Sequence, residues 1–384
     1  MNKNNLVLLH LSLINGIGPA LVLKFIKNLF DNFVKKQRHP GIHDLEFDLS
    51  QVYNLRQSDF INIYGFTQKQ SEIIYSGLLN RELFDKELDL INKYQINLLT
   101  FLDAEYPEIL KSIYLPPIVL YTKGEKLSSY DKKLSIVGAR KSTNYSEQVL
   151  DLLVPEIVKN NISIVSGGAL GVDTFAHKKA IESGGKTIVV LGSGLLKPYP
   201  KENIKFFKNI SNGCGTLVSP FKLNSDPERG NFPARNRIIA GMSFGCLVVE
   251  AAQKSGALIT AQFALDEGRS VFAIPGDIFS PMSLGTNNLI KQGAKLVLNT
   301  NDVLEEYGIN VIAEEKKISV KANKSALKST ELKDSFLENL TYATSIDDLS
   351  AKLNLDIFTL QEKLFDLELE GKVKQNLAGY WEKL

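Results

Sequence analysis

Two glycine-containing turns, each preceded by a short apolar run rich in β-branched residues, are the segments of this chain best suited to chemistry. Leu134–Val137 leads into Gly138-Ala139-Arg140, and Ile162–Val165 leads into Ser166-Gly167-Gly168. About 25 residues separate the two runs, enough for one crossover helix, so they predict a β-α-β unit in a parallel sheet. Both turns then lie at the carboxyl edge of that sheet, where open α/β sheets bind ligands.

The residue types at these turns favour phosphate over a dinucleotide. A dinucleotide fingerprint needs G-x-G-x-x-G and an acidic residue that ends the next strand. Arg140 stands where the second glycine is expected, and Ser166-Gly167 supplies no carboxylate. A guanidinium at a strand tip beside a helix N-terminus suits phosphate, and glycine turns can expose backbone amides to it. An Arg140 paired with a carboxylate, and a tight turn without a ligand, remain as alternatives.

Two later segments extend the same chemistry. Gly192-Ser193-Gly194 forms a third glycine turn and leads to Tyr199-Pro200-Lys201. Between Arg229 and Arg237 three arginines are interleaved with Phe232. Cations combined with an aromatic ring are typical of surfaces that hold phosphates and stack on bases. The alternative is an ordinary charged surface loop.

One apparent phosphate motif is misleading. Gly184-Gly185-Lys186-Thr187 resembles the end of a P-loop, but Ala180 replaces the first glycine. The segment also precedes a strand, whereas a P-loop follows one. We therefore expect Gly184 to end the preceding helix as a C-cap.

The acidic and histidine residues near the turns show no catalytic constellation. Asp173 and His177 lie four residues apart, a spacing that could bind a metal, but no third ligand is evident, and a buried hydrogen-bonding pair is the simpler interpretation. Glu250 ends a strand and could act as a general base, orient Arg235 or Arg237, or accept loop amides.

The elements that position these residues alternate along the chain. Strands are predicted at 96–101, 118–121, 134–137, 162–165, 186–191, 245–249, 271–274 and 295–298, and helices at 146–159, 172–183, 202–210, 258–267 and 287–292. This alternation indicates an α/β fold, an extended Rossmann-like doubly wound sheet over residues 91–310.

Smaller regions flank this sheet. Residues 1–90 are predicted to be all-helical, with a turn at Gly16-Ile17-Gly18-Pro19. Residues 311–330 are polar and lysine-rich, which predicts a linker. Residues 331–384 predict three helices, at 336–340, 346–353 and 358–369, and a hairpin through Val373 and Trp381. Three helices followed by a hairpin are a winged-helix pattern.

Charge is distributed unevenly along the chain, although the formal net charge is only +2. Residues 123–240 contain 18 Lys and Arg against 10 Asp and Glu, whereas residues 331–384 contain 6 against 11. The central region could therefore attract a polyanion more easily than the C-terminal region. No apolar run reaches the ~18 residues of a membrane span, and Cys214 and Cys246 form no disulfide framework or metal motif. We expect a cytoplasmic protein with no membrane partner.

Seven motifs together resemble the DNA-processing protein A family, also called DprA or Smf, over roughly residues 95–308. In order they are IVGARKS, SGGALGVDTFAH, VLGSG with YPKEN, FPARNRIIAG, VVEAAQKSGALITAQFAL, FAIPGDI and GTNNLIKQGA. More weakly, residues 1–90 resemble the sterile-alpha-motif-like or helix-hairpin-helix-like domain of that family, and residues 331–384 resemble its winged-helix-like domain.

The resemblance implies a protein that is not an enzyme and needs no cofactor or metal. Family members bind single-stranded DNA, protect incoming DNA, form homodimers and load a RecA-type recombinase during natural transformation. Carried over by motif position, the candidate DNA contacts are Gly138, Ala139, Arg140, Ser166, Gly167, Gly168, Lys201, Arg229, Phe232, Arg235 and Arg237. Two positions depart from the family pattern: Ala139 lacks the usual hydroxyl, and Ser219-Pro220 stands where Ser-Glu is common.

Two other functions remain open. The sheet edge is also similar to that of LOG-type nucleotide phosphoribohydrolases, but their Pro-Gly-Gly-x-Gly-Thr-x-x-Glu motif is broken here. Pro275-Gly276 is followed by Asp277-Ile278, and Gly285-Thr286 is displaced. The acidic C-terminal region favours a protein-protein adaptor in which DNA binding is secondary, because a negatively charged domain is repelled by phosphate.

Overall fold

The computed structural model describes residues 2–37, 48–309, 344–353, 357–376 and 380–383. Contacts divide the chain into two compact units, Met1–Ile312 and Ala313–Leu384. Within the described ranges, no helix is both long and apolar enough to cross a membrane.

A nine-stranded mixed sheet forms the centre of the first unit, in the order β1-β2-β6-β5-β4-β3-β7-β8-β9. The strands from β6 to β9 in this order are parallel, and β1 and β2 form an antiparallel extension. The strands are β1 Asn97–Thr100, β2 Val119–Gly124, β3 Lys132–Val137, β4 Ile162–Ser166, β5 Thr187–Val190, β6 Gly215–Ser219, β7 Gly245–Val248, β8 Ser270–Ala273 and β9 Lys295–Leu296.

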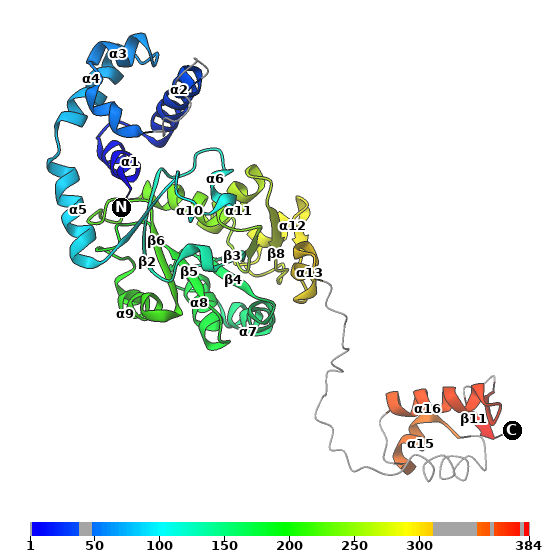
Figure 1. The fold of residues 1–384 in the computed structure, drawn as a ribbon. Coiled ribbons are helices and arrows are strands. Elements are labelled where there is room, and N and C mark those ends of the chain that lie inside the picture. Colours follow the sequence, from blue (N-terminus) through cyan, green and yellow to red (C-terminus); the bar gives the residue numbers. More distant parts are fainter. Residues whose placement is uncertain (1, 38–47, 310–343, 354–356, 377–379, 384) are drawn as a thin grey trace. The chain divides into compact units, whose positions relative to one another are not determined.

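Helices cover both faces of the sheet, as Figure 1 shows. The helices α7 Asn144–Lys159, α8 Val172–Glu182 and α9 Ile204–Asn209 lie on one face, and α10 Asn231–Gly241 and α11 Gly256–Asp266 lie on the other. The shorter helices α6 Glu108–Lys111, α12 Leu284–Lys291 and α13 Asn301–Leu304 complete this region. Alternation within β3 explains the two layers: Leu134 and Ile136 pack with α7 and α8, and Val137 packs with α10 and α11.

The connection from β6 to β7 reverses the direction in which strands are added. Strands β3, β4, β5 and β6 are added in one direction, and β7, β8 and β9 are added on the other side of β3. The reversal makes the gap between β3 and β7 the topological switch point of the sheet, and ligands of open α/β proteins bind there, at the carboxyl ends of the strands.

The predicted β-α-β unit and the Rossmann-like sheet are confirmed. Strands β3 and β4 pair in parallel, with Leu134 opposite Ile164. Gly184 follows α8 with φ of +78°, and its N–H donates to the carbonyl of Ile181, as expected of a helix-ending glycine.

Several elements were not predicted, and β6 and α10 are the two that matter most for the sheet and its pockets. Strand β6 is only five residues long and follows the polar segment Ile210–Cys214, so its periodicity is too short to stand out. Helix α10 contains Pro233 in its first turn, where proline is tolerated. Its two arginines and Asn236 conceal a helical pattern whose buried positions include Arg235, Ile238 and Ile239.

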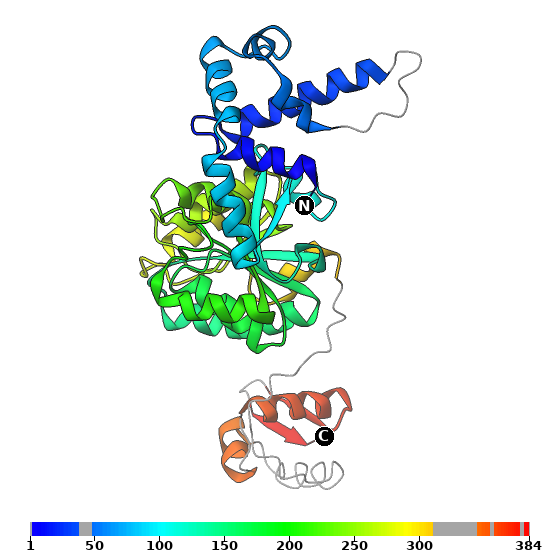
Figure 2. The same ribbon diagram turned by 60° about the vertical axis from the view of Figure 1, so that its left-hand side comes forward.

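Two of the five described N-terminal helices, α1 Lys3–Leu13 and α5 Glu82–Tyr94, pack directly on the sheet. The other three are α2 Pro19–Gln37, α3 Gln57–Asn62 and α4 Gln68–Leu79. Figures 1 and 2 show α1 and α5 beside the end of the sheet where β2 lies. Asn5 of α1 donates to Asp103, and buried Glu87 of α5 accepts from the backbone N–H of Leu223 at 2.7 Å. These bonds and a shared apolar core join the helices to the sheet.

The second unit contains two described helices and a hairpin. They are α15 Ile346–Leu353, α16 Ile357–Leu369 and the antiparallel pair β10 Val373–Gln375 and β11 Trp381–Lys383. Trp381 packs in a small core with four leucines and Val373. The predicted linker at 311–330 and the predicted helix at 336–340 lie outside the described residues.

Candidate nucleic-acid interface

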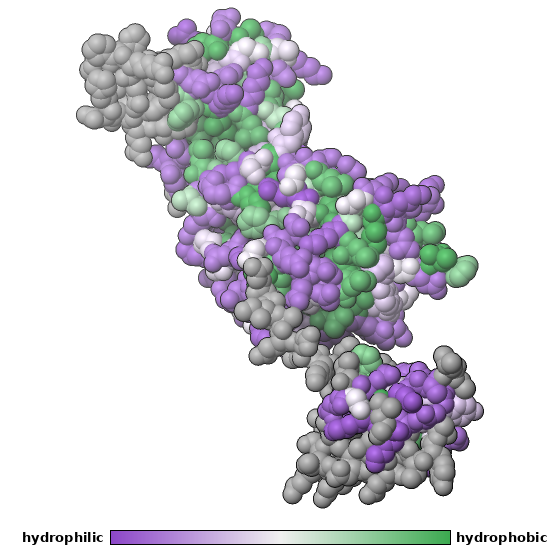
Figure 3. Space-filling view, turned by 90° about the vertical axis from the view of Figure 1, so that its right-hand side faces the viewer, coloured by the Kyte–Doolittle hydropathy of each residue, from purple (hydrophilic) through white to green (hydrophobic). Residues whose placement is uncertain are grey.

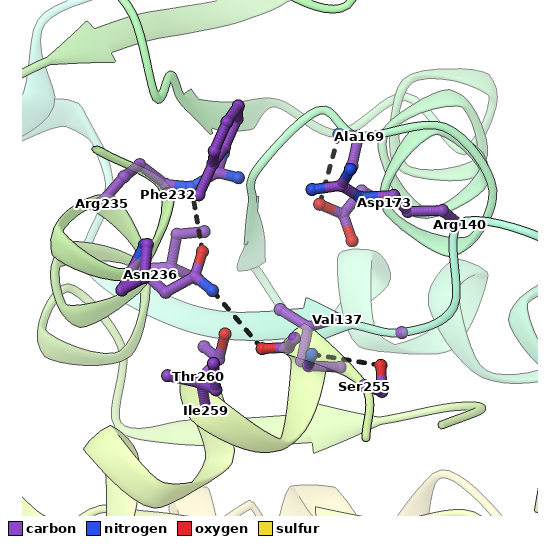
Figure 4. A pocket seen from close by; sticks show the side chains of 15 residues that line it. Val137, Arg140, Ala169, Asp173, Phe232, Arg235, Asn236, Ser255, Ile259 and Thr260 are labelled. Carbon is purple, nitrogen blue, oxygen red and sulfur yellow. Dashed lines mark hydrogen bonds between the residues drawn. The ribbon is translucent and has the colours of Figure 1, made fainter. Parts of the chain in front are cut away.

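Two adjoining pockets lie at the carboxyl edge of the sheet, at the switch point. The larger measures about 370 Å³ and the smaller about 40 Å³, and Arg140, Ala169, Phe232 and Arg235 line both. In Figure 4, Phe232 and Asn236 come from α10 and Thr260 comes from α11, whereas Arg140 approaches from the turn after β3. The pockets therefore share one mouth that is bordered by five separate segments of the chain.

Arg140 is the most available cation at this mouth. Its guanidinium carbon lies 5.6 Å from the centre of the Phe232 ring, within cation–π range. Arg140 is exposed, and it makes no ion pair with any carboxylate of the part of the chain that the structure describes. The structure therefore does not show the alternative in which Arg140 pairs with a carboxylate. The positive charge of its guanidinium is free to bind an anion.

Phe232 is held as a half-buried wall between the two pockets. A Cβ at Gly192 would lie 2.8 Å from the Phe232 ring, so glycine at the third turn is what allows the ring to settle there. The Tyr199 ring packs edge-on against Phe232 with a centroid distance of 6.0 Å, and Tyr199 is exposed. The two rings together give the mouth an aromatic rim.

Arg235 has a structural position, unlike Arg140. It is 5% exposed, and its Nη1 donates to the carbonyl oxygens of Gly167 and Val190 at the ends of β4 and β5. A Cβ at Gly167 would collide with this guanidinium, which explains the glycine. Burial lowers the pKa of Arg235 to about 10, and nearby Asp173 opposes that shift.

Asp173 occupies the backbone donors that were expected to hold phosphate at the second turn. Its Oδ2 accepts from the N–H groups of Gly167 at 3.1 Å and Ala169 at 3.3 Å. Burial raises the pKa of the Asp173 carboxyl, while Arg235 and these amide donors act in the opposite direction. The two amides and Arg235 therefore stabilise a buried carboxylate and are not available to a ligand.

Asp173 and His177 are both buried, as predicted, but they bond to different groups. His177 Nδ1 lies 2.7 Å from the hydroxyl of Thr187, and burial lowers the pKa of His177 to about 3. No group of three or more potential metal ligands occurs among the described residues. The carboxylate and the imidazole thus serve separate parts of the core.

Glu250 accepts loop donors, one of the three roles considered for it. Its carboxylate takes the backbone N–H of Thr143 at 2.9 Å and the Thr143 hydroxyl at 2.6 Å. Thr143 is the N-cap of α7, so Glu250 fixes the start of that helix beside the Arg140 turn. A carboxylate with both oxygens engaged is poorly placed to act as a general base.

The structure separates the remaining predicted site residues into three groups. Ala139, Ser166 and Gly168 are buried beneath the turns; Ser166, for example, donates to the carbonyl of Ile136 at 2.6 Å. Lys201 and Arg229 are exposed but do not line either pocket. Arg237 lies near Tyr106 and Glu267, away from the mouth.

Several lining residues were not predicted as contacts. Asn236 follows Arg235 on α10 and accepts from its Nε at 3.0 Å, which fixes the orientation of the amide. Ser255, Gly256 and Thr260 come from the first turns of α11, so the positive end of that helix dipole lies at the pocket. The sequence signal was the Ser-Gly that opens α11 after the loop that follows β7, since a helix N-terminus at this edge of a sheet suits an anion.

The arrangement can bind a phosphate and a planar ring side by side. Arg140 and the α11 N-terminus supply positive charge, Phe232 and Tyr199 supply aromatic faces, and Val137 and Ile239 give the larger pocket an apolar floor. A few polar groups over an apolar floor are typical of ligand pockets.

Comparison with known proteins agrees with this architecture. The family model of DNA recombination-mediator protein A matches residues 97–308. The DNA processing protein DprA of Bacillus subtilis (strain 168) is 42% identical over 212 residues, which are 55% of this chain and 71% of that protein. Protein Smf of Escherichia coli (strain K12) is 36% identical over 285 residues, 72% of this chain and 75% of that protein.

Solved structures show the same relationship. The X-ray structure of DprA from Streptococcus pneumoniae matches with a TM-score of 0.64 and 32% identity, covering 80% of this chain and 98% of that one. DNA processing protein A from Helicobacter pylori, described for its single-stranded DNA binding mode, matches with a TM-score of 0.50 and 32% identity, covering 56% of this chain and 95% of that one. The chain therefore belongs to the DNA recombination-mediator protein A family, as its motifs predicted.

Proposed function

We propose that this protein binds single-stranded DNA at the mouth formed by Arg140, Phe232 and Tyr199. The observation that carries the proposal is the exposed Arg140 guanidinium, free of any described ion pair and placed over the Phe232 ring. A phosphate would meet Arg140, and the adjoining base would stack on an aromatic face. The Helicobacter pylori relative, whose structure is described for its single-stranded DNA binding mode, supports this assignment.

Binding of this kind tolerates any sequence. Phosphate is common to all nucleotides, and every base has a π-face, so stacking gives about 1–3 kcal/mol per base with little base preference. Lys201 and Arg229 lie exposed on flanking segments, where they could track the backbone on either side of the mouth. We keep both as outer contacts, and we leave out Arg237 because it faces Glu267.

A comparison of single-stranded and double-stranded oligonucleotides across a salt series tests the proposal. We expect tighter binding of the single strand, because only unpaired bases offer free faces to Phe232 and Tyr199. The logarithm of affinity should fall linearly with the logarithm of salt concentration, as counterions are released from phosphates. Equal affinity for both forms would contradict a stacking site.

The wider role follows from family membership. We propose that the protein protects incoming DNA and loads a RecA-type recombinase during natural transformation, without catalysing a reaction, in the cytoplasm. Nuclease protection of a bound strand, followed by recombinase filament assembly on it, measures both steps. Release of free base from a nucleoside monophosphate would instead support the phosphoribohydrolase alternative, although no observation at Glu250 favours it.

We also propose that the protein forms a homodimer through an apolar face near the edge strand β9. Exposed Leu152 and Leu298, with Tyr145, border a groove of about 240 Å³ there. Figure 3 shows a band of hydrophobic side chains on the side of the first unit where α12 and α13 lie. Leu298→Lys should convert a dimer to a monomer in light scattering; an unchanged mass would place the interface elsewhere.

For the flanking regions we retain the predicted identities as proposals. The boundaries 1–90, 91–310, 311–330 and 331–384 would define a sterile-alpha-motif-like or helix-hairpin-helix-like domain, the DNA-binding domain, a linker and a winged-helix-like domain. In the second unit, α16 followed by the hairpin β10–β11 supports the last of these. Its acidic composition suits contact with protein better than contact with DNA.

A further inference from the structure

The loop between β8 and α12 carries two very exposed apolar side chains that the proposed function does not use. Ile278 is 73% exposed and Phe279 is 88% exposed, the most exposed large hydrophobic residue among those described. Exposed side chains of this size on a structured loop indicate a contact with another molecule.

This loop is held by its own hydrogen bonds. Asp277 Oδ1 accepts from the N–H of Phe279 at 2.9 Å, and the Asp277 carbonyl accepts from Ser280 at 3.0 Å. At the base of the loop, the Asn287 side chain bonds both the N–H and the carbonyl of Gly276. Little backbone entropy therefore remains to be lost when Phe279 meets a partner.

The loop lies on the same edge of the sheet as the DNA mouth. It follows the carboxyl end of β8, and Met282 accepts from the N–H of Ala251 at 2.8 Å, which ties it to the turn after β7. Four steps between neighbouring strands lead from β5, beneath Phe232, to β8. At a strand spacing of about 4.8 Å, this corresponds to about 19 Å, a length that several nucleotides of a single strand can span.

The edge between the two aromatic positions is cationic. Arg140 and Lys141 follow β3, and Lys254 lies in the turn after β7; all three are exposed and form no ion pair with a described residue. On the loop itself, the Asp277 carboxylate is turned onto the backbone of Phe279. Aromatic rings separated by cations along one track are the pattern of single-strand binding surfaces.

We propose that Phe279 is a second base-stacking position on the same DNA strand, several nucleotides away from the base on Phe232. The proposal rests on the proposed function, because the strand must first be held at Arg140. It extends the site to the β8–α12 loop and predicts that affinity depends on oligonucleotide length.

Length-dependent binding by two variants tests the proposal. Phe279→Leu removes the π-face but keeps an apolar side chain, and Ile278→Ala is the matched control on the same loop. We expect Phe279→Leu to weaken binding of an oligo(dT) of roughly 12 nucleotides about fivefold or more. The same variant should bind an oligo(dT) of roughly 4 nucleotides as tightly as wild type does, because the short strand cannot reach Phe279. Ile278→Ala should bind both oligonucleotides like wild type. Equal losses in Phe279→Leu and Ile278→Ala would indicate general apolar contact and overturn stacking.

Arg140→Ala separates failure of this inference from failure of the proposed function. If Arg140→Ala weakens both lengths and Phe279→Leu weakens neither, the DNA site stands and the second stacking position is wrong. If neither variant changes affinity, the site itself is wrong. A lower mass of Phe279→Leu in light scattering would show that the loop joins copies of the chain, which would also overturn the inference.

A fluorescence measurement reports stacking directly. The chain has a single tryptophan, Trp381 in the second unit. The difference between Phe279→Trp and wild type therefore isolates the signal at position 279. We expect the longer oligo(dT) to quench this signal and an abasic strand of equal length to leave it unchanged, since only a base can stack. Equal quenching by both strands would contradict the proposal.

Discussion

The two ends of the parallel sheet both carry a pocket, and the larger one is at the end without the proposed site. The pocket at the amino edge measures about 740 Å³ and is lined by Lys132, Lys159 and Lys186 among others. The main pocket at the carboxyl edge measures about 370 Å³. Volume and the number of lysines would favour the amino edge, so other properties must distinguish the two.

Those properties are the partners of the cations and the direction of the helices. At the amino edge Lys186 is 3.1 Å from Glu125, Lys159 is 3.5 Å from Glu156, and Lys132 points to the carbonyl of Tyr307. Helices α7 and α8 also end there, with the negative ends of their dipoles. At the carboxyl edge the helices begin, and Arg140 has no such partner. Free charge and dipole direction, rather than size, distinguish an anion site.

The largest effect that we expect comes from Arg235→Leu. Loss of this buried guanidinium leaves the carbonyls of Gly167 and Val190 without their donor and removes a nearby positive charge that favours the Asp173 carboxylate. Each buried carbonyl left without a donor costs about 1–3 kcal/mol of stability. Thermal unfolding should show a lower melting temperature, with DNA binding lost as the turns rearrange. A variant as stable as wild type would show that Arg235 does not hold the edge.

The DNA affinities of two variants, Arg140→Ala at the carboxyl edge and Lys186→Ala at the amino edge, test the comparison of the two edges most directly. Removing the unpaired cation should cost about 2 kcal/mol, or about 30-fold in affinity, for every DNA sequence. The salt slope of log affinity should fall by about one. Lys186→Ala, at the amino edge, should change neither quantity. Equal effects in a filter-binding salt series would mean that both edges contact DNA.

A smaller effect is expected from Phe232→Leu, which keeps an apolar wall but removes the ring. Stacking on one base is worth about 1 kcal/mol or more, so affinity should fall about fivefold. The loss should vanish on an abasic strand, which retains the phosphates but has no bases. If the abasic strand shows the same loss, Phe232 acts only by supporting Arg140.

The smallest effect is expected from deleting residues 315–384. The two units are compact by themselves, and residues 331–384 of the second are acidic in composition. Affinity for a single strand should stay within about twofold of the full chain, because the acidic segment 331–384 adds little to phosphate binding. A gel shift of both proteins at the same salt concentration measures this, and a large loss would assign part of the DNA site to the second unit.

Much of the fold could be predicted because its signals are local. Short β-branched runs that end in glycine indicate strands, and Leu134–Val137 and Ile162–Val165 formed the expected parallel pair. Helix α10 escaped prediction because a buried Arg235 looks polar in sequence, and burial depends on partners from β4 and β5 that are distant along the chain. For the same reason, the sequence could not show that Arg140 is exposed and Arg235 is buried.

The family, the doubly wound sheet and the clustering of glycine turns at one edge follow from residue types and their spacing along the chain. Which donors remain free depends instead on contacts between segments that are distant in sequence. Asp173 takes the turn amides, Arg235 is buried and Glu250 holds Thr143, the N-cap of α7, whereas Arg140 is left exposed over Phe232. Availability is a property of three-dimensional partners, since a charge or an amide binds a ligand only when the fold has not already paired it.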